Sequence, residues 1–181
     1  MAVYNTPSDA ANTAVRSFLT SVGEFYYAAS FNTGSGKGRT VWLQIQKEFN
    51  DRCAYCGGVG KLQIEHLVMF NRSEYGLHHP GNVVPVCRTC NEREKDEHKK
   101  YVSWQTQLAR KSVGQDQTLI TSRRQRIEGH IDRYMYPNLS QPERSAIAVI
   151  AESLYDNIKA ESEKSLALYK KLDQAFVVDA A

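Results

Sequence analysis

Two pairs of cysteines flank the middle of this chain, and their spacing is its pattern with the most direct chemical meaning. Cys53 and Cys56 form one Cys-x-x-Cys pair, and Cys87 and Cys90 form the other. Together the two pairs provide four thiolates, which is a ligand set for one tetrahedral zinc ion. Four thiolates leave no open position for water, so we expect a structural and not a catalytic zinc.

A redox motif or a pair of disulfides would account for less of the cysteine pattern. A redox Cys-x-x-Cys motif needs only one pair, in a thioredoxin-like setting. Two disulfides would suit a secreted chain, but the first five residues lack the basic and apolar regions of a signal peptide. A single zinc site that uses all four cysteines suits a reducing cytoplasm, where we expect this protein. No apolar run reaches the length of a membrane helix, so no membrane partner is expected.

A histidine preceded by a carboxylate lies between the two cysteine pairs. His66 can accept a proton near neutral pH, which suits a general base. Glu65 directly precedes it, and Asn91 directly follows the fourth cysteine; both offer oxygen ligands suited to magnesium or manganese. Asn82 could hold the imidazole of His66 through its side-chain oxygen and so fix its tautomer. These residue types could activate a water and neutralise the charge of a phosphate.

In its central part the chain resembles the HNH nucleases, also called ββα-metal nucleases, in their zinc-bound HNN form. The resemblance covers about a quarter of the chain and rests on these residues: Cys53, Cys56, Glu65-His66, Asn82, Cys87, Cys90 and Asn91. Glu65 stands where the family more often has aspartate, and Asn91 stands at the place of the final histidine. The resemblance implies hydrolysis of DNA phosphodiester bonds to 5′-phosphate and 3′-hydroxyl ends, with one catalytic Mg or Mn ion.

Backbone geometry limits how Glu65 and His66 could act together. Adjacent side chains of a regular strand point to opposite faces. A shared metal site therefore requires an irregular strand end or a bulge at Glu65-His66.

Each candidate residue could also have an ordinary structural role. His66 could be a hydrogen-bonded histidine on a strand, and Glu65 a surface carboxylate. Asn82 could be a turn residue after Pro80-Gly81, and Asn91 could be the N-cap of a following helix. The order and spacing of the whole set favour catalysis over these separate roles.

Basic side chains could grip the phosphates of DNA, although in the simpler interpretation they form a solvated face. The net charge of +3 is compatible with nucleic acid without proving it. The candidates for DNA contact are Lys37, Arg39, Arg72, His79, Arg88 and Lys95. Arg93 is expected on the same solvated face, His78 in a solvated loop, and His130 at the surface.

Hydrophobic periodicity and turn residues predict an α+β fold. Helical patterns cover residues 8–29, 40–50, 91–100, 104–111, 121–135 and 140–173. Strand patterns cover residues 62–68 and 82–86, with a loop over 71–81 between them. Ser140 and Glu143 fit a capping box at the start of the last helix. The predicted organisation is an N-terminal helical region with a basic loop (1–50), a zinc-stapled ββα-metal module (51–103) and a C-terminal helical region (104–181).

The function predicted from these features is that of a restriction endonuclease that cuts double-stranded DNA. Such an enzyme with one active site per chain would work as a homodimer. The expected contact stripe lies on the long last helix: Val149, Ile150, Leu154, Ile158 and Leu166. A homing or phage-type nicking enzyme is the alternative within the class. A non-catalytic zinc module that binds nucleic acid is the alternative outside it.

Overall fold

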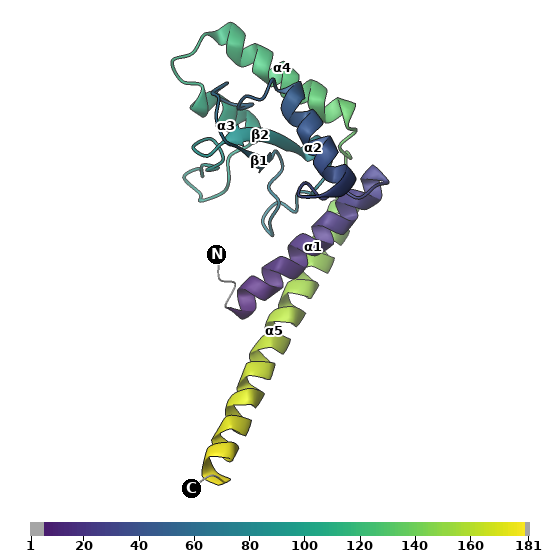
Figure 1. The fold of residues 1–181 in the computed structure, drawn as a ribbon, viewed down its shortest axis with the longest axis vertical. Helices are drawn as coiled ribbons and strands as arrows, with labels where there is room; N and C mark the ends of the chain where they lie inside the picture. The colour runs from purple at the N-terminus through teal and green to yellow at the C-terminus, as the bar shows by residue number, and fades with distance from the viewer. Residues whose placement is uncertain (1–5, 180–181) are drawn as a thin grey trace. The chain divides into compact units, whose positions relative to one another are not determined.

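The computed structural model describes residues 6–179, and the side chains of residues 6–176. It is a mixed α+β structure, as predicted. The elements in chain order are α1 (Pro7–Tyr27), α2 (Gly36–Glu48), β1 (Leu62–His66), the 3-10 turn η1 (Pro80–Asn82), β2 (Val83–Cys87), α3 (Trp104–Lys111), α4 (Gln117–Arg133) and α5 (Gln141–Asp179) (Figure 1).

The sheet is a two-stranded antiparallel hairpin that confirms both predicted strands. β1 pairs with β2 in unbroken register, from Leu62 opposite Cys87 to His66 opposite Val83. Pro85 is tolerated in β2 because both strands of a two-stranded sheet are edge strands, where a missing N–H costs little. The hairpin therefore begins beside a cysteine and ends at His66.

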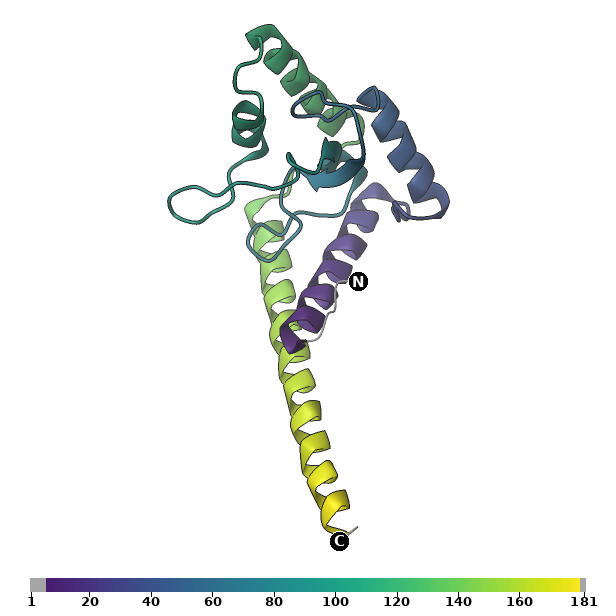
Figure 2. The same ribbon diagram turned by 60° about the vertical axis from the view of Figure 1, so that its left-hand side comes forward.

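Helices cover the hairpin and complete its core. Trp42, Ile45 and Phe49 recur at helical spacing along α2 and its C-cap and are buried. They join Val83 and Val84 of β2 in one apolar cluster. Helix α2 contacts β2 and η1, while α4 contacts η1 and α3 (Figure 2). The loop that carries η1 is held by these helices, and the hairpin is fixed with it.

The segment after the fourth cysteine corrects one prediction. Residues 91–100 form turns and an isolated bridge between Lys95 and Tyr101, and not the predicted charged helix. The Asp96 carboxylate accepts hydrogen bonds from the backbone N–H groups of His98 (2.9 Å) and Lys100 (2.9 Å). Such local side-chain bonds compete with helix formation. The first helix after β2 is therefore α3, at Trp104.

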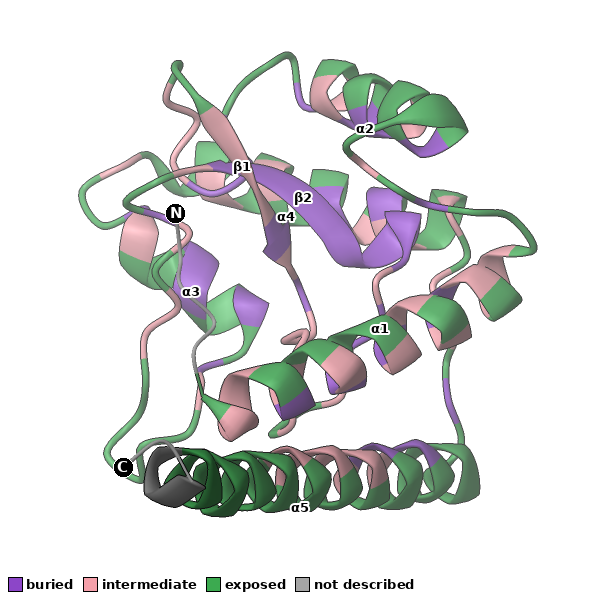
Figure 3. Cartoon of the chain, turned by 60° about the horizontal axis from the view of Figure 1, so that its bottom comes forward, coloured by how far each residue is buried: buried purple, intermediate pink, exposed green. Residues whose placement is uncertain are grey.

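The chain divides into two compact units, Leu19–Leu139 and the pair of segments Met1–Phe18 and Ser140–Ala181. Within the second unit, the first part of α1 runs beside α5 (Figures 1 and 3), and Ala11, Val15, Ile147 and Ala151 are buried. The predicted capping box begins α5, because the Ser140 N–H and hydroxyl both donate to Glu143 Oε2 (2.6 and 2.5 Å).

Between residues 163 and 176 the long helix α5 is exposed, and its exposed side chains include the apolar residues Leu166, Leu168, Tyr169, Leu172 and Phe176. Across residues 6–179, no helix combines the length and the apolar character that crossing a bilayer requires.

Candidate functional site

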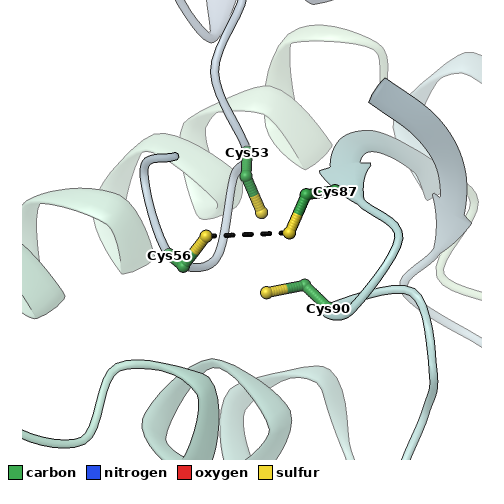
Figure 4. A group of neighbouring side chains, drawn as sticks. All are labelled: Cys53, Cys56, Cys87 and Cys90. Carbon is green, nitrogen blue, oxygen red and sulfur yellow. Dashed lines mark hydrogen bonds between the residues drawn. The ribbon is translucent and has the colours of Figure 1, made fainter. Parts of the chain in front are cut away.

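The four cysteines converge in space (Figure 4), with their sulfur atoms all within 4.8 Å of one another. Cys56 Sγ lies 3.8 Å from Cys87 Sγ. Zn–S bonds of about 2.3 Å place tetrahedrally arranged sulfurs about 3.8 Å apart. The cysteines are free of disulfides. They are placed where they could hold a metal ion such as zinc.

Local backbone geometry builds the first cysteine turn. The Cys53 N–H donates to the Gly58 carbonyl (2.9 Å), and the Gly57 N–H donates back to the Cys53 carbonyl (2.8 Å). Gly57 adopts a positive φ of 73°, which glycine accepts without strain. A Cβ at Gly57 would also collide with Arg123. Arg123 donates to the Tyr55 carbonyl (3.1 Å), so α4 secures this turn from outside.

The second cysteine turn continues directly from β2. The N–H groups of Cys90 (3.1 Å) and Asn91 (3.0 Å) both donate to the carbonyl of Cys87. Gln107 of α3 is fully buried and donates to the Cys90 carbonyl (3.2 Å). The Ala54 N–H donates to the Pro85 carbonyl (2.8 Å) and joins the first turn to the strand. Both turns are thus positioned by hydrogen bonds of the protein itself.

The thiols are close enough to share protons. A hydrogen bond from Cys90 lowers the pKa of the Cys53 thiol to about 4. The same contact raises the pKa of Cys90, and burial adds to that effect. A dication at the centre would favour deprotonation of the whole set, because metal ligation requires the thiolate form.

Glu65 is the clearest departure from its predicted role. Arg93 donates two hydrogen bonds to Glu65 Oε1, from Nε (2.8 Å) and from a terminal nitrogen (2.5 Å). The two side chains are only 2% (Arg93) and 5% (Glu65) exposed. Arg93 also donates to the carbonyls of His66 (2.9 Å) and Val102 (2.9 Å). Arg93 is thus a buried counterion and not part of a solvated face.

Asn91 lies on the other side of the same carboxylate. In the amide orientation that satisfies its neighbours, Asn91 donates to Glu65 Oε2 (3.0 Å) and to the Ile64 carbonyl (3.2 Å). The structure therefore brings Glu65 and Asn91 together, as predicted. However, Arg93 and the Asn91 amide group take up the carboxylate oxygens, and burial raises the pKa of Glu65 against the opposing charge of Arg93. This arrangement does not fit a Mg or Mn site.

The buried pair leads to a stability prediction. We expect Glu65→Gln to lower the free energy of unfolding by about 3–5 kcal/mol, because it leaves the Arg93 guanidinium buried without a counterion. The double variant Glu65→Met/Arg93→Leu should recover much of that loss, since replacing a whole buried pair by apolar groups is often neutral. Urea unfolding of the wild type, of the single variants Glu65→Met and Arg93→Leu, and of the double variant measures the coupling. Additive effects would contradict the ion pair.

Asn82 also has a different role from the predicted one. Its Oδ1 accepts from the Val68 N–H (2.8 Å), while its Nδ2 donates to the carbonyls of Val68 (2.9 Å) and Leu77 (2.8 Å). The side chain is buried, and these bonds close the loop between β1 and β2. Its oxygen therefore serves the Val68 backbone, and the prediction that it holds His66 is wrong.

The imidazole of His66 is held instead by residues from the loop. His66 Nε2 lies 3.0 Å from His78 Nδ1. The ring of Phe70 stacks on His66 with centroids 4.7 Å apart and an interplanar angle of 16°. His66 is half-buried at the end of β1, where the register with β2 is regular. The bulge that a shared metal site would require is absent there, so Glu65 and His66 face opposite sides of the hairpin.

The predicted DNA-contact residues differ in exposure. Lys37 and Arg39 in the first turn of α2 are exposed, as are Arg88 between the cysteines of the second pair and Lys95. Arg72 is half-buried in the loop. His79 is only 1% exposed, and its Nδ1 accepts from the Gly81 N–H (3.0 Å). Burial lowers the pKa of His79 to about 4, so this neutral, buried ring is not a phosphate contact.

Three residues make important contacts that the sequence pattern does not indicate. The pattern places Arg93 and His78 in solvated segments and His130 at the surface. His130 is fully buried and links Glu48 of α2 (3.1 Å) to the Pro80 carbonyl (3.0 Å). A signal for His130 exists in the apolar residues around it in α4, whereas nothing local distinguishes Arg93 from its charged neighbours.

Comparisons of the chain with protein-family models, with curated proteins and with solved structures found no match. The functional interpretation therefore rests on the residues and their geometry.

Proposed function

We propose that this chain is an HNH-type DNA endonuclease in which His66 is the general base and the four cysteines hold one structural zinc. The observation that carries the proposal is the setting of His66. It ends a hairpin whose opposite end is the cysteine cluster, and its ring is fixed between Phe70 and His78. A histidine held in one orientation at a half-buried position suits proton transfer from a water. The products would carry 5′-phosphate and 3′-hydroxyl ends.

The proposal includes a requirement for Mg or Mn, because charge at the phosphate must be neutralised. It assigns neither Glu65 nor Asn91 as a ligand, since Arg93 holds the carboxylate. The exposed side chains of Lys37, Arg39, Arg88 and Lys95 would contact the DNA backbone. A reducing cytoplasm would keep the cysteines available for zinc.

The roles of Glu65 and Asn82 favour a second candidate, a non-catalytic zinc module that binds nucleic acid. Both residues distinguish the HNH pattern from a simple zinc knuckle, yet each has a structural task here: Glu65 neutralises Arg93, and Asn82 closes the loop. In this alternative the exposed basic residues bind phosphates and His66 only packs. The two candidates predict the same binding and opposite results for cleavage.

The physiological role within the nuclease class is also part of the proposal. A restriction enzyme acting on both strands would pair two copies through α5. Val149 and Ile150 are 69% and 50% exposed, and Leu166 is 49% exposed, while Leu154 and Ile158 are half-buried. These five residues are the predicted stripe, and a second copy would remove them from water. A monomer of the nicking type would leave it exposed.

The assay that tests the proposal uses supercoiled plasmid and the full chain. With added Mg or Mn, we expect conversion of the plasmid to linear products with 5′-phosphate ends, and no conversion in EDTA. Light scattering at micromolar concentration should give twice the monomer mass. A monomer that yields only nicked circles would support the nicking alternative. Tight DNA binding without cleavage under every metal condition would establish the second candidate in place of a nuclease.

A further inference from the structure

We propose that a pocket between α4 and the first cysteine turn (residues 52–57) binds a phosphate group of the DNA backbone. The pocket has a volume of about 220 Å³, and its lining includes three arginines, Arg52, Arg123 and Arg126. This inference rests on the DNA binding that both candidate functions share. It adds a built site to the separate exposed basic residues that those functions use.

Helical spacing brings two of these arginines to the pocket. The run Arg123-Arg124-Gln125-Arg126 carries three arginines within four residues. Ser122, Arg123 and Arg126 line the pocket together, because residues three or four positions apart share one face of a helix. Arg124 does not line it, and its guanidinium pairs with Glu128 one turn along the helix (2.9 Å). The helix therefore divides the basic run between the pocket and a surface ion pair.

The first cysteine turn holds two of the guanidinium groups in place. Arg123 Nη1 donates to the Tyr55 carbonyl (3.1 Å), and Arg52 Nη1 donates to the Gly57 carbonyl (3.2 Å). Gly57 lets Arg123 lie against the turn, since an added Cβ would lie 2.5 Å from Arg123 Nη2. The N–H groups on Nε and Nη2 of both arginines donate to no described residue, so they remain for a ligand. Side chains that are held before binding lose less conformational entropy when the ligand arrives.

The charge of the pocket is unbalanced. No described residue forms an ion pair with the exposed Arg126, and no carboxylate is among the described residues that line the pocket. Positive charges that gather without a counterion repel one another, and an anion between them removes this repulsion. The hydroxyl of Ser122 adds a neutral donor to the same wall. The pocket is therefore chemically suited to an anion.

Phosphate is the anion that fits this donor set. The planar guanidinium group donates two parallel hydrogen bonds to phosphate oxygens, which is why arginine is so common in phosphate sites. The pocket is smaller than the about 300–1,000 Å³ of sites that enclose drug-sized ligands. A volume of about 220 Å³ suits one phosphate group and not a whole nucleotide.

The position of the pocket favours a phosphate that belongs to a DNA strand. Arg52 and Arg126 are exposed, so a phosphate that is part of a long chain can reach them. Arg88 in the second cysteine turn is exposed as well, so both cysteine turns present arginine to solvent. The pocket is lined by Cys53 at the cysteine end of the hairpin, whereas His66 lies at the other end. The bound phosphate would therefore position the DNA and would not be the group that is cleaved.

A pair of variants on α4 tests the site through DNA binding. Fluorescence anisotropy on duplex DNA, in the absence of Mg and Mn, should show that Arg126→Gln reduces the slope of log affinity against log salt by about 1. The same slope corresponds to an affinity about 5-fold lower at about 0.15 M salt. Arg126→Lys keeps the charge but loses the paired donors, so it should recover part of the affinity.

Arg124→Gln is the matched control, because it removes the same charge from the same helix outside the pocket. Its affinity and salt slope should stay close to those of the wild type. Equal losses in Arg124→Gln and Arg126→Gln would overturn the pocket, since they would show an effect of overall charge. Arg123 is left unchanged because it secures the first cysteine turn.

Titration with inorganic phosphate tests the pocket without DNA. In ¹⁵N-labelled full-length protein, sodium phosphate should shift the Nε–H signals of Arg52, Arg123 and Arg126 to saturation, whereas sodium chloride at equal ionic strength should not. Single Arg→Gln variants at positions 52, 124 and 126 identify the signals of those side chains. No saturable shift, or an equal shift of Arg124, overturns the pocket. Phosphate binding together with wild-type DNA affinity in Arg126→Gln would assign the pocket to free phosphate and overturn the DNA backbone as its ligand.

Kinetics on plasmid DNA separate this inference from the nuclease proposal. Arg126→Gln should raise KM and leave kcat nearly unchanged, as expected for a contact that binds substrate and transition state equally. A wild type that shows the expected binding but cleaves no DNA retains the pocket and rejects the nuclease. A wild type that cleaves DNA, with the same KM and salt slope in Arg126→Gln, retains the nuclease and rejects the pocket.

Discussion

Replacing Cys87 with serine is expected to unfold the cysteine turns and the β1–β2 hairpin. Serine does not supply a thiolate, and Cys87 both ends β2 and lies 3.8 Å from its neighbouring ligand Cys56. Structural zinc contributes an apparent binding free energy of about 10–16 kcal/mol. That amount is comparable to the total stability of a typical domain, about 5–15 kcal/mol. Loss of one thiolate should therefore unfold the hairpin and not only lower its stability.

Zinc content and amide hydrogen exchange measure this outcome. The wild type should contain one zinc per chain, and Cys87→Ser should lose the zinc together with the exchange protection of β1 and β2. Thr89→Ala is the matched control, because Thr89 is exposed in the same turn and contributes no thiolate. If metal-free wild-type protein is fully folded and its hairpin amides are protected from exchange, the prediction that zinc holds this module together is refuted.

Features that depend on local chemistry were predictable from the sequence. The four cysteines converge because each pair folds within its own turn, and the strand after the first pair leads back to the second. The capping box at Ser140 and Glu143 forms as predicted, since it needs only residues three apart. Helix α3 has the predicted boundaries, Trp104–Lys111. Within each cysteine pair, in the capping box and in α3, the signal and the interaction lie within a few residues.

The predicted helix over 91–100 is wrong because contacts outside the segment decide its conformation. The charged sequence has no strong helix breaker, and its ion-pair spacing favours a helix. In the structure Arg93 turns inward to Glu65 of β1, and Asp96 binds two N–H groups of its own turn. The burial of one arginine is not visible in the local pattern, because it depends on the positions of Glu65 and Arg93 together.

The candidate site likewise contains some residues that the sequence indicates and others that only the fold reveals. His66 and its neighbours in sequence could be singled out by type and spacing, but the partner of His66 could not. His78 lies twelve residues along a loop, and its orientation depends on Phe31, on Gly23 of α1 and on the loop closure by Asn82. Residue types therefore indicate which histidine could do chemistry, whereas the fold determines what holds it.

Replacing His66 with alanine is expected to lower the rate of DNA cleavage by about 10²- to 10⁴-fold, the usual effect of losing a general base. The reason is that His66 lies at the end of the hairpin where the loop begins, with its ring against His78 and Phe70. Zinc content should stay at one per chain, because the cysteine cluster lies at the opposite end of the hairpin. DNA affinity, measured by fluorescence anisotropy at fixed salt, should change little, since the exposed basic residues remain.

His98→Ala provides the matched control for His66→Ala. Its side chain is 73% exposed in the segment after the second cysteine pair, so removing it deletes an imidazole without touching the hairpin end. This variant should cleave at the wild-type rate. A thermal melt of each variant separates lost chemistry from lost folding, because the loss of activity in His66→Ala should persist at temperatures where the protein is fully folded. Wild-type cleavage by folded His66→Ala would remove this histidine from the mechanism.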